Sequence, residues 1–145
     1  ADLCLTNQAE TDILELIFNA TTWLDIAEDK VAGPATQLYV SLHTSSPGET
    51  GNQGTNETSY TNYARTGVLR TTVGWTITGD TASNAAAIEF PACGAVGATS
   101  THYGIGNSQT GAGNLLFYGD LTTQLVVGQS VVPKFEIGAL TLTAD

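Results

Sequence analysis

The sequence has very little positive charge. Four of its 145 residues are Lys or Arg, against 14 Asp or Glu, so the formal net charge is −10 at pH 7. A strongly acidic surface repels phosphate groups, and we therefore expect neither nucleic acid nor an anionic membrane as a partner. The same charge favours solubility and attracts positively charged protein surfaces.

Long hydrophobic runs, closely spaced cysteines and a leader-like start are also missing. No apolar run reaches the roughly 18 residues that indicate a membrane-spanning helix. The two cysteines, Cys4 and Cys93, lie far apart in the chain. We expect two buried free thiols, with a single disulfide as the alternative. The first residues lack a basic region followed by an apolar core, so we expect no signal peptide.

Glycine, threonine and apolar side chains make up for the missing charge. The hydrophobic share is 41 % and the charged share only 12 %, about half of the usual value for a soluble chain. This composition favours short β-strands joined by many turns. A single apolar stripe with helical spacing runs through Ile13, Leu14, Leu16 and Ile17, which predicts an amphipathic helix over residues 8–19. We therefore predict an N-terminal helical arm over residues 1–30 and a β-domain over residues 31–145.

The β-domain is expected to be organised around residues 63–78. Two runs rich in Val, Thr and aromatics flank a break at residues 72–74, which predicts two adjacent strands, with Trp75 buried between apolar neighbours. Residues 79–84 read as a turn. Further strands are expected at residues 37–43, 85–90, 99–106, 115–121, 124–127, 131–135 and 139–143. This spacing predicts a mainly β fold, an antiparallel β-sandwich or jelly roll, with one N-terminal amphipathic helix.

Residues that could support catalysis or bind a metal are sparse. His43 and His102 are the only histidines, no metal-ligand spacing occurs, and no Gly-x-Ser-x-Gly motif is present. Oxygen-bearing residues between Glu49 and Glu57 could offer ligands to calcium, but a solvated loop is the simpler interpretation. We therefore expect no enzyme, no cofactor and no metal.

The two arginines and one long loop are the remaining features of interest. Arg65 and Arg70 are half of the positive charge and are expected on one strand, facing opposite sides. One would then pair within the subunit, while the other would face solvent or a neighbour; ordinary surface pairing is the alternative. Residues 44–61 form a polar loop that is long enough to suggest a functional role.

Several motifs resemble those of a known family. They are LTN at 5–7, LYVSLHTSSPGETG at 38–51, YARTGV at 63–68, SNAAAIEFPA at 83–92, THYGIGNSQTGAGNLLFYGDLT at 101–122 and PKFEIGALTLTAD at 133–145. The order of these motifs resembles small virion proteins of tailed bacteriophages, which are described as tail-fibre-like or as capsid decoration (cement) proteins. The segment 23–32 departs from the family pattern. The motifs lie at turns and strand ends, so they indicate structure rather than catalysis.

The resemblance implies a symmetric oligomer, a dimer or trimer, that binds the major capsid protein on the outer capsid surface of the virion after synthesis in the bacterial cytoplasm. We expect a decoration protein; the alternatives are a tail-fibre or receptor-binding module and, less well supported, a secreted carbohydrate-active or lectin-like domain. The helical arm is expected to clamp a neighbour and the long loop to touch the shell. The interface candidates are Ile13, Leu14, Ile17, Trp23, Glu49, Glu57, Arg65 and Arg70.

Overall fold

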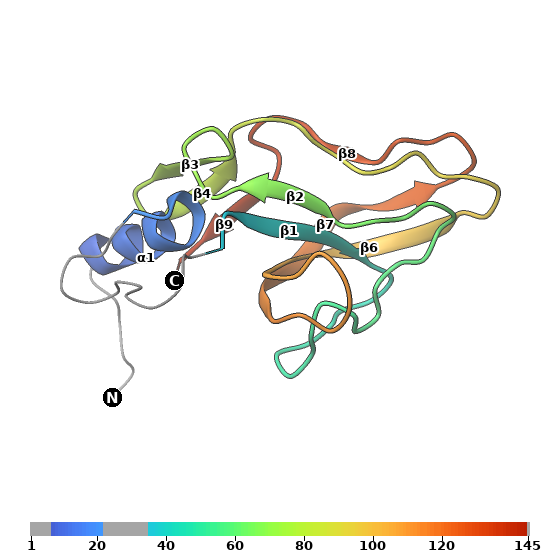
Figure 1. Ribbon diagram of the computed structural model, residues 1–145, viewed down its shortest axis with the longest axis horizontal. Coiled ribbons are helices and arrows are strands. Elements are labelled where there is room, and N and C mark those ends of the chain that lie inside the picture. The colour runs from blue at the N-terminus through green and yellow to red at the C-terminus, as the bar shows by residue number, and fades with distance from the viewer. Residues whose placement is uncertain (1–6, 22–34, 145) are drawn as a thin grey trace. The chain divides into compact units, whose positions relative to one another are not determined.

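A computed structural model of the chain describes residues 7–21 and 35–144. Its elements follow one another from a single helix, α1 (Asn7–Asn19), through nine strands (Figure 1). The strands are β1 (Gln37–His43), β2 (Thr66–Leu69), β3 (Trp75–Thr78), β4 (Thr81–Asn84), β5 (Ile88–Glu89), β6 (Ala98–Gly106), β7 (Leu115–Val127), β8 (Lys134–Phe135) and β9 (Thr141–Thr143). Within the described ranges, no helix is long and apolar enough to cross a membrane.

These elements confirm the predicted fold class. The chain is mainly β, the β1–β6, β6–β7, β3–β4 and β4–β9 pairs are antiparallel, and the helix lies near the N-terminus. The jelly-roll topology stays a prediction. The helix predicted over residues 8–19 is confirmed as α1, whereas the second helical turn expected around Trp23 lies outside the described residues.

The chain folds as two compact units, each assembled from separate segments. Unit 1 comprises Ala1–Thr36, Leu69–Ile88 and Phe135–Asp145, and unit 2 comprises Gln37–Val68 and Glu89–Lys134. The sheet of order β3-β4-β9 belongs to unit 1, and the sheet of order β2-β1-β6-β7 to unit 2. The predicted division into an arm over 1–30 and a β-domain over 31–145 stays a prediction.

Unit 1 is built around the predicted tryptophan. Trp75 is fully buried, and its ring meets that of Phe18 of α1 edge-on at a centroid distance of 4.4 Å. The helix contacts β3 and β4, so it covers a sheet of its own chain. An aromatic pair of this kind contributes about 0.5–1.5 kcal/mol beyond the apolar area that it buries.

The C-terminus of α1 is held by Arg70. The guanidinium donates to the carbonyl oxygens of Leu16, Ile17 and Ala35 at 2.6, 2.5 and 2.6 Å. The last turn of a helix leaves carbonyl groups without intrahelical partners and carries a partial negative charge, and a guanidinium satisfies both. Desolvation by burial lowers the pKa of Arg70.

Two strand predictions were wrong. The runs around residues 72–74 do not pair with each other, because β2 joins the sheet of β1 in unit 2 and β3 joins β4 in unit 1. Val73 is 69 % exposed in the turn between β2 and β3. Residues 81–84, read as a turn, form β4, which pairs with β3 in a tight hairpin where Gly79 has a φ of +61°.

Unit 2 has its core between β1, β6 and the aromatic residues that follow the long loop. On β1, Leu38, Val40 and Leu42 are buried as their alternation predicts. A second cluster combines Tyr60, Cys93 and Val127. The Tyr60 hydroxyl donates to the Pro91 carbonyl oxygen at 2.7 Å, and burial raises the pKa of Tyr60 to about 12.

Candidate functional site

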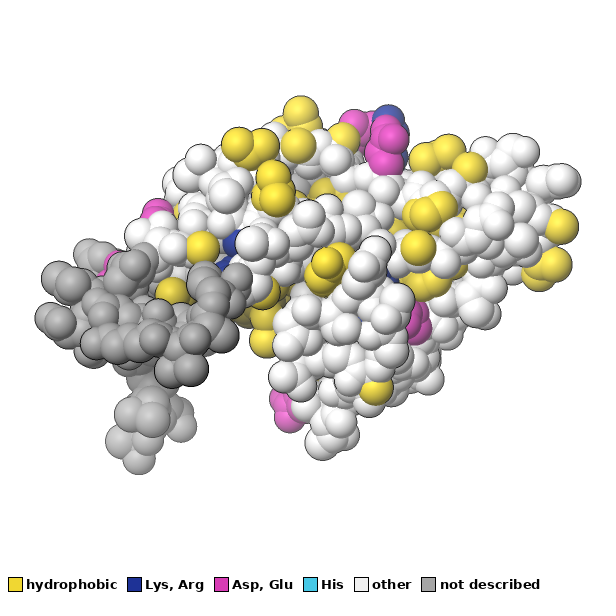
Figure 2. Space-filling view, in the orientation of Figure 1, with side chains coloured by type: hydrophobic (Ala, Val, Ile, Leu, Met, Phe, Trp, Pro, Cys, Tyr) yellow, Lys and Arg dark blue, Asp and Glu magenta, His cyan; other side chains and the backbone are white. Residues whose placement is uncertain are grey.

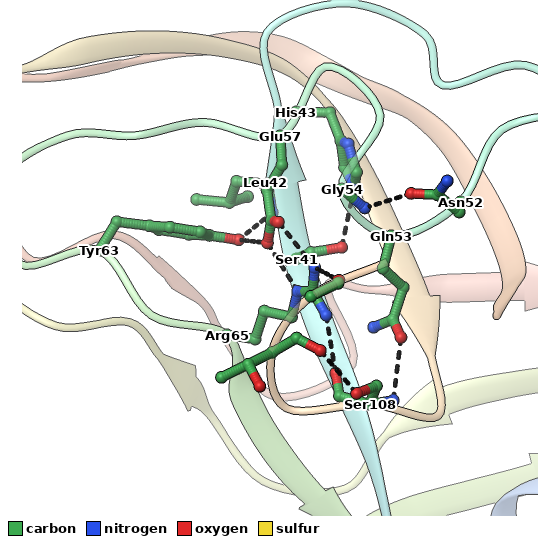
Figure 3. Close-up of polar contacts among 12 residues, drawn as sticks. Ser41, Leu42, His43, Asn52, Gln53, Gly54, Glu57, Tyr63, Arg65 and Ser108 are labelled. Atoms are coloured by element: carbon green, nitrogen blue, oxygen red, sulfur yellow. Dashed lines mark hydrogen bonds and ion pairs between the residues drawn. The ribbon is translucent and has the colours of Figure 1, made fainter. Parts of the chain in front are cut away.

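The loop that follows β1 turns back along that strand and covers its polar face. A hydrogen bond from the Thr58 N–H to the Leu42 carbonyl oxygen (2.9 Å) and an antiparallel bridge between His43 and Glu57 attach its far end to β1. Ser41 and His43 are fully buried beneath it. Ser41 and His43 lie on the face of β1 opposite Leu38, Val40 and Leu42. This polar face is therefore covered by the loop and belongs to a hydrogen-bonded network (Figure 3).

Glu57 and Arg65 form the charged centre of this network. The Arg65 Nε and Nη2 groups donate to the two carboxylate oxygens of Glu57, each at 2.7 Å. The Tyr63 hydroxyl donates to Oε1 of Glu57 at 2.8 Å and accepts the Leu42 N–H at 3.1 Å. The Arg65 side chain is 3 % exposed and that of Glu57 17 %. A two-pronged, nearly buried pair of this kind fixes position and orientation together.

Arg65 also reaches the loop between β6 and β7. Its Nη1 donates to the Ser108 carbonyl oxygen at 2.9 Å, and its Nη2 to the Gly111 carbonyl oxygen at 2.6 Å. The hydrogen bond with Glu57 is the main reason that the pKa of Arg65 is raised. One guanidinium thus connects residues 44–61 with residues 107–114, which are far apart in the sequence.

His43 joins the same loop to β1. Its Nδ1 lies 2.8 Å from the Thr55 carbonyl oxygen and its Nε2 lies 2.8 Å from the Ser41 hydroxyl oxygen. A carbonyl oxygen can only accept, so Nδ1 carries the proton in the neutral ring and Nε2 accepts from Ser41. Burial lowers the pKa of His43 below its usual value, which favours this neutral form.

Gln53 provides a third connection between the two loops. Its Oε1 accepts the Ser108 N–H at 2.9 Å, and its own backbone N–H donates to the Gly113 carbonyl oxygen at 3.0 Å. A Cβ atom at Gly106 or Gly113 would overlap the Gln53 side chain, so this close approach requires glycine at both positions. The Gln53 side chain is fully buried.

The outer part of the long loop has its own turn structure. The Asn52 side-chain oxygen accepts the Gly54 N–H at 2.8 Å, and the Asn52 N–H donates to the Thr55 hydroxyl at 3.0 Å. Asn56 adopts a left-handed conformation with a φ of 54°, and its side chain donates to the Ser46 carbonyl oxygen at 2.9 Å. The result is an ordered polar surface whose outward residues, Thr44, Ser45, Ser46, Glu49 and Thr50, are exposed.

The charged and titratable groups of this network are occupied by one another and by backbone groups. The Glu57 carboxylate is occupied by Arg65 and Tyr63, and both ring nitrogens of His43 are hydrogen-bonded. Within residues 7–21 and 35–144, no group of three or more His, Cys, Asp or Glu side chains could hold a metal ion. What the geometry does is hold two polar loops in one fixed conformation.

Comparison with known proteins identifies the family. A family model described as podophage GP4 fiber I protein gp80 matches residues 5–143, nearly the whole chain. The chain belongs to this family. No curated protein matches it. The resemblance to virion proteins of tailed phages is thereby confirmed, and the protein is a fibre-related virion protein.

In this fibre-family protein, the predicted interface residues lie in different places. Within α1, Leu14 is buried and Ile13 and Ile17 are partly buried, whereas Trp23 lies outside the described residues. Glu49 is exposed on the long loop. A role of any of these residues at an interface stays a prediction.

The two arginines correct the sequence analysis. Arg65 precedes β2 and Arg70 follows it, and they belong to different units. Arg65 is 8 % exposed overall, so its pairing with Glu57 is not an ordinary surface contact. Arg70 does not face solvent as a free charge, because the α1 carbonyl groups hold it. The carbonyl oxygens that accept from Arg70, and those of Ser108 and Gly111 that accept from Arg65, were not predicted from the sequence.

Ser41, Gln53 and Ser108 were missed as members of the network. Ser41 and His43 alternate with the apolar residues of β1, and a polar face of this kind is consistent with a covering loop as well as with solvent. A clue was present in the long loop itself, whose Asn, Gln and Thr residues can satisfy a buried polar strand face. His102 contacts the carboxylate of its β7 neighbour Asp120 at 2.6 Å.

Proposed function

We propose that the protein is a structural module of a virion fibre, without catalytic activity. The observation that carries this proposal is the match of residues 5–143 to a family described as a fibre protein. The geometry supports it, because the titratable groups that come together serve to fix loops. Glu57 and Arg65 neutralise each other, and His43 is buried and fully hydrogen-bonded.

The long loop is the proposed contact surface of this module. Its backbone is fixed by Glu57, His43 and Gln53 from within, while its outward side chains are small and polar except for that of Glu49. Binding to such a surface costs little conformational entropy, because the loop is already ordered. The face drawn in Figure 2 carries few charged side chains, which favours recognition by shape and by neutral hydrogen bonds.

A second candidate is decoration of the capsid through the major capsid protein. It is favoured by the absence of any repeat of fixed period in the sequence, since a fibre shaft is normally built from repeats. A decoration protein binds the shell through its surface, and each copy can bind weakly because many copies together stabilise the shell. The chain would then be present wherever the shell offers its site.

Copy number and position in the virion separate these two roles. Quantitative mass spectrometry of purified particles should give a small number of copies, set by the fibre attachment points, and cryo-electron microscopy should place them on a fibre. Many copies in proportion to the major capsid protein, on the shell itself, would reject the fibre role and support decoration. Density in which residues 44–61 face only solvent would reject this loop as the contact surface.

A further inference from the structure

Tyr118 on β7 is the exposed aromatic residue of the described chain. It is 37 % exposed, whereas each of the other aromatic residues within 7–21 and 35–144 is buried or partly buried. Tyr60 and Tyr63, by comparison, donate their hydroxyl groups to Pro91 and Glu57 inside the fold. Tyrosine is enriched at contact surfaces, because it offers a large apolar ring with a polar tip. Tyr118 is therefore a candidate for contact with another molecule.

Asp120 lies on the same face of β7 as Tyr118. Tyr118 pairs with Gly104 and Asp120 with His102, and the two register shifts of the β6–β7 pair lie outside this stretch. Residues two apart in a regular strand point to the same side and are about 7 Å apart. Both residues are exposed, so the ring and the carboxylate are neighbours on one accessible surface.

The Asp120 carboxylate is anchored to the sheet. Nε2 of His102 lies 2.6 Å from its Oδ1, and Nδ1 of His102 lies 2.8 Å from the Thr101 hydroxyl oxygen. The Thr101 hydroxyl donates in turn to the Thr44 carbonyl oxygen at 3.0 Å. The Asp120 side chain remains 85 % exposed. A carboxylate has about four acceptor positions, so it can accept from a ligand as well as from His102.

Both groups attract positive charge. The face of an aromatic ring attracts cations, and a carboxylate forms strong charge-assisted hydrogen bonds with them. A cation between Tyr118 and Asp120 uses both attractions, whereas an anion is repelled by Asp120 and by the net charge of −10. A guanidinium suits the pair better than an ammonium, because its plane stacks on the ring while its N–H groups point to the carboxylate.

The chain itself has no free arginine to offer. Arg65 and Arg70 are its two arginines. Arg65 is buried and paired with Glu57, and Arg70 donates to carbonyl oxygens at the end of α1. A second copy of the chain has the same two engaged arginines. We propose that Tyr118 and Asp120 form a docking site for an arginine side chain of a different protein of the virion.

An NMR titration of the full chain with N-acetyl-arginine methylamide at constant ionic strength tests the proposal. We expect the Tyr118 ring and Asp120 carboxyl resonances to shift together. Asp120→Asn and Tyr118→Leu should each reduce the remaining shift at a fixed probe concentration about three- to fivefold, since each removes one of the two attractions. The lysine analogue should give a smaller shift, and a higher salt concentration should reduce both responses.

Glu49 provides the matched control, because it is an exposed carboxylate with no aromatic residue in the surrounding residues 44–54. Its resonances should shift less than those of Asp120, and Glu49→Gln should leave the response of Tyr118 unchanged. Tyr118→Leu keeps the contact between Asp120 and His102, so its effect does not arise from a displaced carboxylate. Urea unfolding shows whether each variant remains folded.

Three outcomes would overturn the proposal. They are equal shifts at Glu49 and Asp120, a response of Tyr118 that survives Asp120→Asn in full, and no response to the arginine probe. Methyl glycosides of glucose, galactose and mannose form the second arm of the titration. A response to one of them without a response to the arginine probe would assign the surface to a neutral glycan instead. The test uses only the free protein, so its outcome is separate from that of the fibre proposal.

Discussion

Replacement of Glu57 by Gln tests whether the ion pair with Arg65 holds the two loops of unit 2. The change keeps the shape of the side chain but removes its charge and turns one acceptor into a donor. The two Arg65 hydrogen bonds to Glu57 are affected, while those to Ser108 and Gly111 remain. The guanidinium then stays buried without its counter-charge.

The expected cost follows from the burial of the two side chains. Loss of one partner from a buried pair costs about 3–5 kcal/mol. Glu57 is 17 % exposed, so water can replace part of the lost contact, and Gln retains one acceptor oxygen. We therefore expect Glu57→Gln to lower the free energy of unfolding by roughly 2–3 kcal/mol. Urea unfolding measures this value, and the slope of the transition shows whether unfolding stays two-state.

Glu49→Gln is the matched control, since Glu49 is exposed on the same loop and its replacement changes the net charge equally. Its effect should stay within about 0.5 kcal/mol. Hydrogen exchange should also show faster exchange across residues 107–114 in Glu57→Gln, because Arg65, the partner of Glu57, donates to the Ser108 and Gly111 carbonyl oxygens. Equal stability of the two variants, or unchanged exchange in residues 107–114, would refute the idea that Arg65 transmits the contact.

Three further predictions concern other contacts. Burial lowers the pKa of His43 in the folded state, so near pH 6.5 only the unfolded chain binds a proton at this residue, and the free energy of unfolding should fall as the pH is lowered below that value. In urea unfolding at several pH values, His43→Gln should reduce the slope of the free energy of unfolding against pH by up to about 1.4 kcal/mol per pH unit. Arg70→Met should cost about 1–2 kcal/mol in urea unfolding and speed hydrogen exchange at the end of α1, because the helix carbonyl groups lose their donors. Gly104→Ala should lower the melting temperature at a cost of about 1–3 kcal/mol, since its Cβ would lie 2.7 Å from His43 Nε2 and 2.8 Å from Leu115 Cδ1.

The sequence predicted local elements well where one face of an element is buried. The alternation in residues 37–43 matches β1, and the apolar stripe of residues 8–19 matches α1. Both patterns depend only on which side chains are apolar and how they are spaced, and this spacing is visible within a few neighbouring residues. Strand β7 was predicted as two strands with a break near residue 122, and the structure has one strand with one of its two register shifts there.

Strand partners and the candidate site could not be predicted in the same way. The short segment between β2 and β3 resembles a hairpin turn, yet the two strands join different sheets because their partners come from distant parts of the chain. β4 was missed because Thr81, Ser83 and Asn84 are polar, although Asn84 is buried and accepts the Leu140 N–H at 2.9 Å. The network around Arg65 depends on a loop folding back over β1, and no local pattern records that contact.

The positions of the two arginines have a consequence for digestion by proteases. Trypsin cuts after Lys and Arg and needs several neighbouring residues to enter its cleft in an extended form. Arg65 and Arg70 are each held by hydrogen bonds to backbone carbonyl groups, so the segments that follow them cannot easily detach. In the described part of the chain, Lys134, which lies in β8, is the other Lys or Arg residue. Within residues 7–21 and 35–144, a particle that carries this protein would therefore present few bonds after Arg that trypsin can reach, although this part of the chain is rich in loops.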